Sequence, residues 1–121
     1  MAETGNLEGF GREYVRQVRD GSLAWLDAVM SGQIKGARCE RLYASIAEFS
    51  PQQREALRTP CAHLTDHILH ETLNLFEQSE RWRLADEAGE NLAEFSDGLC
   101  GELYGEDGWI ERFSGYPASL K

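Results

Sequence analysis

The chain has 121 residues, 41% of them hydrophobic and 27% charged, which predicts one globular domain over residues 1–121 and excludes an intrinsically disordered segment. No apolar run approaches the length of about 20 residues that a membrane span requires. The first residues lack the basic and apolar regions of a secretory signal. The formal net charge of −9 argues against binding to nucleic acid or to an anionic membrane, because both would be repelled.

The acidic side chains are unevenly distributed. Residues 1–83 contain 12 acidic and 10 basic side chains, whereas residues 84–121 contain 9 and 2. An acidic region of this kind serves solubility, or attracts a cation or a basic protein partner. The three cysteines, Cys39, Cys61 and Cys100, are odd in number and widely spaced, which argues against a disulfide framework and a zinc knuckle. Reduced thiols in a cytoplasmic protein are expected.

Helical spacing of apolar residues predicts a first helix over residues 6–19 and a second that begins after Ser22. Asp20-Gly21 is expected to end the first helix, and Ser22 to cap the second. The apolar face of the first helix consists of Leu7, Phe10, Tyr14, Val15 and Val18. That of the second consists of Leu23, Leu26, Val29 and Met30, with Trp25 beside it.

A third helix is predicted over residues 37–49, with an apolar face of Leu42, Tyr43, Ile46 and Phe49. Ser50, Pro51 and Gln53 then form a capping box with proline at the first helical position, which predicts the start of a fourth helix. Thr59-Pro60 predicts either a kink in this helix or a new helix capped by Thr59. The expected core face of this region consists of Leu57, Cys61, Leu64, Ile68, Thr72 and Leu75.

Residues 82–95 predict a short β-hairpin around a turn that contains Gly89, with a helical turn over 91–95 as the alternative. Four glycines within residues 96–108 indicate turns and a loop, and Trp109, Ile110 and Phe113 could form a final short helix. Tyr116-Pro117 is expected to end regular structure. The predicted fold class is therefore mainly α: a small domain of four to five helices with a possible short β-hairpin near residues 82–95.

All three histidines, His63, His67 and His70, lie on one face of the predicted fourth helix, at spacings of four and three residues. Imidazoles spaced in this way can bind one metal ion, with Asp66 or Glu71 nearby as a further ligand. The histidines fall about half a turn from the predicted apolar face by the 100° rule. A polar, solvated face without metal is therefore the preferred interpretation, and a metal site is the alternative.

The second candidate site is the C-terminal segment, in which acids alternate with large aromatics. Its members are Glu102, Tyr104, Glu106, Asp107, Trp109 and Glu111. Aromatic side chains can anchor a protein partner, and carboxylates can attract a basic one. In the competing interpretation, Trp109 belongs to the core and the acids form a solvated surface.

No nucleophile elbow, phosphate-binding loop or dinucleotide-binding motif is present, so neither an enzyme nor a cofactor is expected. The favoured hypothesis is a protein-binding module: an acidic immunity or antitoxin protein that neutralises a basic toxin or enzyme. The alternatives are a metal-binding helical protein that uses His63, His67 and His70, and a self-associating adaptor. A homodimer is compatible with either binding role.

Overall fold

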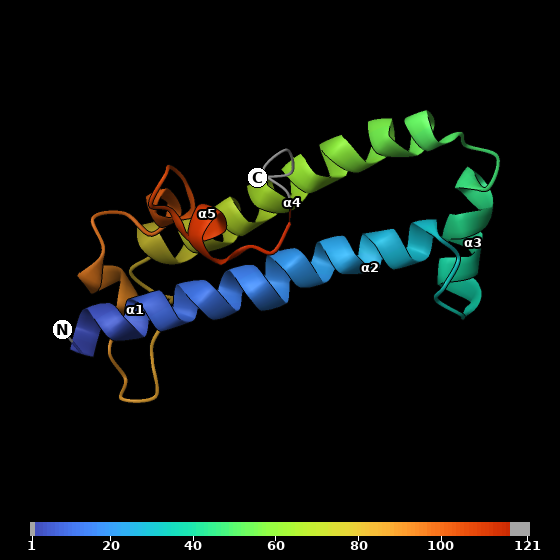
Figure 1. Cartoon of the computed structure of the whole chain (residues 1–121). Helices are drawn as coiled ribbons and strands as arrows, with labels where there is room; N and C mark the ends of the chain where they lie inside the picture. The colour runs from blue at the N-terminus through green and yellow to red at the C-terminus, as the bar shows by residue number, and fades with distance from the viewer. Residues whose placement is uncertain (1, 117–121) are drawn as a thin grey trace.

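The structure, a computed structural model, describes residues 2–116 and, among them, the side chains of residues 6–116. It is mainly helical, as predicted, and is drawn in Figure 1. The elements are α1 (Ala2–Glu13), η1 (Tyr14–Arg19), α2 (Asp20–Met30), α3 (Ala37–Ile46), α4 (Pro51–Gln78), η2 (Leu92–Phe95), η3 (Cys100–Leu103) and α5 (Trp109–Phe113). The predicted end of regular structure at Tyr116-Pro117 falls at the limit of the described residues, because residues 117–121 lie outside them.

Two long arms define the shape of the molecule (Figure 1). The first arm is α1, η1 and α2, which follow one another without a break, and the second arm is α4, which runs in the opposite direction. The predicted break at Asp20-Gly21 is wrong, because Asp20 keeps helical backbone angles (φ −65°, ψ −36°). A glycine inside a helix costs about 1 kcal/mol relative to alanine. Burial of Leu23 directly after it offsets that cost.

A π-helical segment, η1, decides which residues of the first arm face the core. The N–H of Asp20 donates to the carbonyl of Val15, five residues earlier, so the turn holds one residue more than an α-helical turn. Consequently Arg19, at 0% exposure, takes the inward position that Val18 would hold in a regular α-helix. The prediction that Val18 belongs to the core is wrong, and this side chain is 43% exposed.

The capping box is confirmed at the start of α4. The Oγ of Ser50 accepts from the N–H of Gln53 at 3.1 Å, and the N–H of Ser50 donates to the Oε1 of Gln53 at 2.8 Å. Arg54, one turn later, donates to the carbonyls of Met30 and Ile46 and so holds the ends of α2 and α3 together. α3 ends earlier than predicted, and of its expected apolar face only Ile46 is buried.

The prediction for the core face of α4 is wrong. Its buried residues are Ala62, Asp66, Leu69 and Leu73. Leu64, Ile68 and Leu75 are instead 57%, 54% and 54% exposed. The helix continues through Pro60, so a separate helix capped by Thr59 is also wrong. α4 therefore has apolar side chains on two faces, only one of which packs against the rest of the described chain.

The predicted hairpin is reduced to a chain reversal with one antiparallel bridge, between Ala85 and Asn91. Gly89 makes the turn with a φ of +83°, a value that favours glycine. The alternative prediction of a helical turn over residues 91–95 is also met, because η2 follows directly after the bridge. The predicted short helix of Trp109, Ile110 and Phe113 is confirmed as α5.

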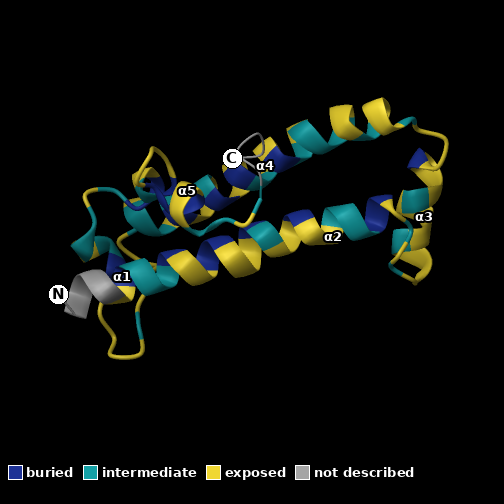
Figure 2. Cartoon of the chain, viewed as in Figure 1, coloured by how far each residue is buried: buried dark blue, intermediate teal, exposed yellow. Residues whose placement is uncertain are grey.

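The main core lies at one end of the molecule, where η2, η3 and α5 pack between the two arms (Figures 1 and 2). Its central members are Leu7, Tyr14, Val15, Leu69, Leu73, Leu92, Leu99, Leu103, Trp109 and Ile110. A smaller cluster joins Leu23 and Ala62 under Tyr116. Toward α3 more of the surface of α4 is exposed (Figure 2). The C-terminal third therefore packs against both arms at the end where the core lies.

Candidate functional site

The predicted C-terminal segment is anchored from beneath by Trp109. This side chain is 0% exposed, and its ring meets Phe10 edge to face at 5.9 Å. It lies directly over Gly11, where a Cβ atom would come within 2.4 Å of the indole. Trp109 is thus a core residue, as the competing interpretation expected, and it cannot contact a partner. It fixes the position of the acids around it.

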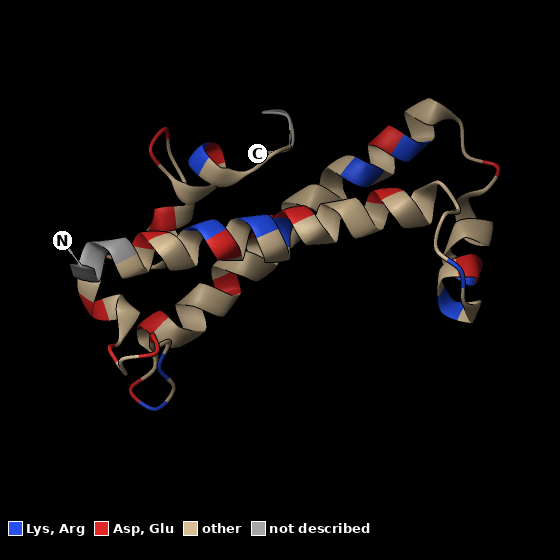
Figure 3. Cartoon of the chain, turned by 60° about the horizontal axis from the view of Figure 1, so that its bottom comes forward, with Lys and Arg blue, Asp and Glu red and all other residues tan. Residues whose placement is uncertain are grey.

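Three acids of the segment, Glu106, Asp107 and Glu111, are exposed. The loop that carries the first two is closed by a hydrogen bond from the N–H of Gly108 to the carbonyl of Gly105, at 3.1 Å. Gly105 has a φ of +92°, which favours glycine, and so shapes the loop. Acidic residues are frequent on the loops and short helices at this end (Figure 3). The carboxylates therefore stand on a defined loop rather than on a loose tail.

Glu102 belongs to an acidic hollow that the sequence did not predict. The hollow has a volume of about 390 Å³ and is lined by Glu77, Asp97, Cys100 and Glu102, with Gly98 and Gly101 between them. The Oε1 of Glu77 accepts from the N–H of Cys100 at 3.0 Å, and the Oε2 of Glu102 accepts from the Oγ of Ser96 at 2.7 Å. No ion pair among the described residues involves these three carboxylates.

Tyr104 connects the acidic segment with the histidines. Its hydroxyl lies 3.3 Å from the Nδ1 of His70, and the two rings are 5.9 Å apart. His63 and His67 are exposed, as the predicted polar face requires, and the ring of His67 stacks on His70 at 6.4 Å. Among the described residues, no three His, Cys, Asp or Glu side chains are grouped closely enough to hold a metal ion.

We expect the purified protein to carry no stoichiometric zinc, iron or nickel. Replacing His67 by Ala should change the free energy of unfolding by less than about 0.5 kcal/mol, because substitutions at exposed sites have small effects. Elemental analysis and thermal unfolding of both proteins test this. One tightly held metal per chain that is lost in H67A would make the metal-binding alternative the better hypothesis.

Buried between the arms is an ion pair that the sequence did not predict. The Nε of Arg19 donates to the Oδ1 of Asp66 at 2.6 Å, and its Nη1 donates to the Oγ of Ser114 at 2.9 Å. The hydroxyl of Ser114 donates in turn to the Oδ1 of Asp20 at 2.7 Å. This network joins the first arm, the second arm and the segment after α5. A buried charge pair needs such additional hydrogen bonds to offset the loss of its hydration.

Three arginines, Arg112 of α5 with Arg12 and Arg16 of the first arm, surround Phe113 and balance part of the charge at the acidic end. The guanidinium of Arg112 pairs with Glu8 and lies over the ring of Phe113 at 4.8 Å, while Arg12 and Arg16 lie 5.2 and 5.9 Å from the same ring. The hydrogen bond from Arg112 lowers the pKa of Glu8, although partial burial opposes this. The acids of the hollow and of the loop before α5 form no ion pair among the described residues, although the charge of Arg112 also interacts with Asp107 and Glu102.

The environment of Cys100 keeps its thiol protonated. All three are free thiols, and Cys100, the buried one, donates its S–H toward the carbonyl of His70 at 3.6 Å. Burial raises the pKa of the Cys100 thiol, and the charge of Glu77 raises it further. A thiol in this environment stays protonated at neutral pH, and the thiolate is the form that attacks.

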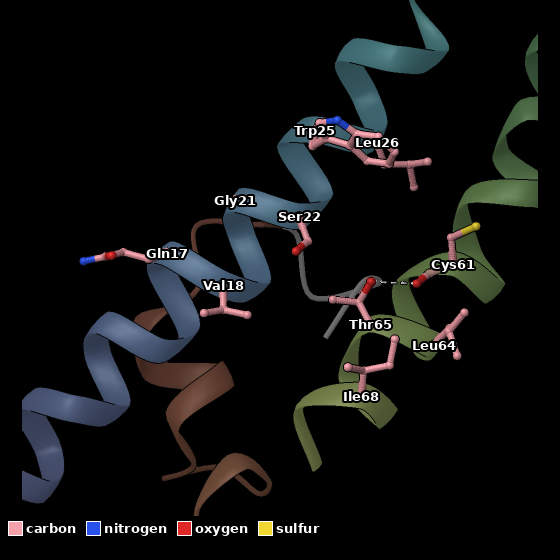
Figure 4. Close-up of a pocket in the computed structure, with 10 residues that line it drawn as sticks. All are labelled: Gln17, Val18, Gly21, Ser22, Trp25, Leu26, Cys61, Leu64, Thr65 and Ile68. Atoms are coloured by element: carbon pink, nitrogen blue, oxygen red, sulfur yellow. Dashed lines mark hydrogen bonds between the residues drawn. The ribbon is translucent and has the colours of Figure 1, made fainter. Parts of the chain in front are cut away.

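A second surface, the apolar groove, lies between the arms (Figure 4). Val18, Trp25 and Leu26 line it from the first arm, and Cys61, Leu64 and Ile68 from the second. It has a volume of about 520 Å³, and none of the described residues that line it is charged. A neighbouring hollow of about 330 Å³ shares Trp25 and Leu26 and extends the groove to Met30, Leu42 and Leu57.

No protein-family model, curated protein or solved structure matches this chain. None of the helices in the described part of the chain is both long and apolar enough to cross a membrane.

Proposed function

We propose that this protein is a non-enzymatic binding protein of the immunity or antitoxin type, which neutralises a basic toxin or enzyme through its acidic end. The observation that supports this most directly is the acidic hollow, where Glu77, Asp97 and Glu102 surround an open space and form no ion pair among the described residues. A lysine or arginine of a partner would complete charge-assisted hydrogen bonds there.

The exposed loop acids and Tyr104 extend the proposed contact surface. Glu106 and Asp107 are exposed beside Tyr104, whose ring is 47% exposed and backed by His70. Exposed carboxylates raise the rate at which a basic partner associates, and a supported aromatic ring supplies contact area. Because Trp109 and Leu103 are buried beneath the loop, little ordering of this surface would be needed on binding.

The test begins with capture of binding partners from lysate of the native cell, followed by association kinetics with the captured protein at low and physiological salt. Replacing Glu106 and Asp107 by Lys should slow association at low salt at least about tenfold, because electrostatic steering contributes about 10- to 1,000-fold. The difference should shrink as salt screens the charges. Far-UV circular dichroism should be unchanged, since both side chains are exposed.

The matched control is E48K/E55K, which makes the same change of net charge with exposed residues at the opposite end of the molecule, near α3. It should slow association much less than E106K/D107K. A tight partner that is insensitive both to salt and to E106K/D107K would remove the acidic loop from the mechanism. Absence of any protein partner would disprove the inhibitor proposal.

A further inference from the structure

The face of α4 that lines the apolar groove shows a repeat typical of helix–helix packing, and this repeat extends beyond the groove to Leu75. On α4, Leu57, Cys61, Leu64 and Ile68 follow one another at steps of four, three and four residues, and Leu75 lies seven residues after Ile68. Such alternation of three and four is the spacing of a coiled-coil seam. The first arm continues the pattern, with Val18 and Trp25 seven residues apart. We call these residues the seam.

The seam is distinct from the core of the chain. On α4 the buried apolar positions are Ala62, Leu69 and Leu73, whereas Leu64 and Ile68 are more than half exposed. A helix with apolar side chains on two faces is typical of a helix packed on both sides. The first arm has the same property, because η1 turns Arg19 inward and leaves Val18 facing the groove. Both arms therefore lack a partner on the same side.

We propose that the groove is a self-association surface, in which two copies meet about a two-fold axis and their four arms form a four-helix bundle. This goes beyond the proposed inhibitor function, because it uses a different surface. A two-fold axis places the same patch of each copy against the other, so a self-complementary seam is sufficient. Four-helix bundles bury such seams along helices that run nearly parallel or antiparallel.

The main groove lacks the charged side chains that would favour a charged partner over a second copy. With a formal net charge of −9, two copies repel one another over most orientations. The described lining of the main groove carries no charged residue, and the neighbouring hollow adds only Arg38, so contact through these two surfaces buries none of the excess negative charge. Glu71 lies on α4 between Ile68 and Leu75 of the seam, and its carboxylate is 3.9 Å from the Nε2 of His70. A basic partner would gain no such advantage from an uncharged groove.

The dimensions of the seam are adequate for a stable dimer. From Leu57 to Leu75 it is about 27 Å long, at about 1.5 Å per residue. Two adjacent helices, each about 10 Å wide, make the face about 20 Å across. Stable interfaces bury about 800 Å² of accessible surface per partner, and a face of this size with protruding side chains is in that range.

Sedimentation velocity of the full chain, from about 1 μM to about 1 mM, tests the proposal over the range in which such a dimer would dissociate. We expect the mass of two chains at high concentration. The double variant L64E/I68E should be monomeric, with a dissociation constant raised at least about 100-fold, because paired seams would bury its added charges. The control H63E/H67E adds the same charge on an exposed face of the same helix and should still dimerise.

V18E, on the first arm, is a second seam variant. It tests the proposal if L64E/I68E loses helical signal in circular dichroism and so fails to fold. It should also be monomeric with an unchanged helical spectrum. Three results would overturn the proposal: a wild-type protein that stays monomeric at about 1 mM, a dimer that survives both seam variants, or open-ended assembly instead of a dimer. E106K/D107K should leave the dimer intact, so this experiment and the inhibitor test can fail independently.

Discussion

Replacing Asp66 by Ala should lower the free energy of unfolding by about 3–5 kcal/mol, because it leaves the charge of Arg19 buried without its main partner. The side chain of Arg19 is fully buried, and that of Asp66 is 11% exposed. Ser114 and Asp20 would remain near the guanidinium, but Asp20 lies 3.6 Å away, compared with 2.6 Å for Asp66. Urea unfolding followed by circular dichroism measures the difference.

Asp27 provides the control. It accepts two hydrogen bonds from Arg58, at 2.7 and 2.9 Å, but its side chain is 43% exposed. D27A should therefore lower the free energy of unfolding by no more than about 1 kcal/mol, because exposed ion pairs contribute little to stability. The double variant R19M/D66L should recover most of the loss of D66A, because removing both charges removes the desolvation penalty. Equal effects of D66A and D27A would show that the pair between the arms contributes little.

Replacing each of two glycines of α1 by alanine should change the free energy of unfolding in opposite directions. At Gly11 a Cβ atom would lie 2.4 to 2.7 Å from three ring atoms of Trp109, and the buried indole has no room to move away. G11A should therefore destabilise the fold by about 1–3 kcal/mol. At Gly9 nothing lies within 4 Å of the added methyl group, so G9A should stabilise by about 0.5–1 kcal/mol through helix propensity.

Urea unfolding of the two single variants separates packing from propensity, because both positions lie in the same helix. Near-ultraviolet circular dichroism provides a second measurement, since only G11A should disturb the environment of Trp109. If G11A were as stable as G9A, the indole would not rest on this backbone, and Trp109 would not be the anchor of the acidic loop.

Local signals in the sequence predicted local structure well. The capping box of Ser50 and Gln53, the short helix at Trp109 and the third helix, which was predicted over 37–49 and ends at Ile46, all depend on neighbouring residues and could be predicted. The continuity of the first arm was not, because burial of Leu23 outweighs the helix-breaking tendency of Gly21. No local pattern in the sequence indicates the π turn at 14–19, so the inward position of Arg19 could not be predicted.

In the candidate sites, too, features that depend on neighbouring residues could be predicted, and features that depend on long-range packing could not. The sequence correctly identified one apolar stripe on α4, at Leu64 and Ile68, but assigned it to the core, because periodicity alone does not say which of two faces packs. The acidic hollow joins Glu77 to Asp97 and Glu102, and the buried pair joins Arg19 to Asp66 across 47 residues. Contacts between residues so far apart in the sequence depend on how the arms pack, and no local sequence pattern determines that packing.

The π turn in the first arm also determines where the chain could lose one residue without a change in the helix on either side. A wide turn accommodates one additional residue without rotating the helix on either side of it. A homologue lacking one residue between Tyr14 and Arg19 would therefore form a regular α-helix there and keep the same inward-facing residues before and after. The same deletion elsewhere in the arm would rotate one part against the other by about 100°. Within this arm, the segment at 14–19 is thus where a single-residue difference in length would be tolerated.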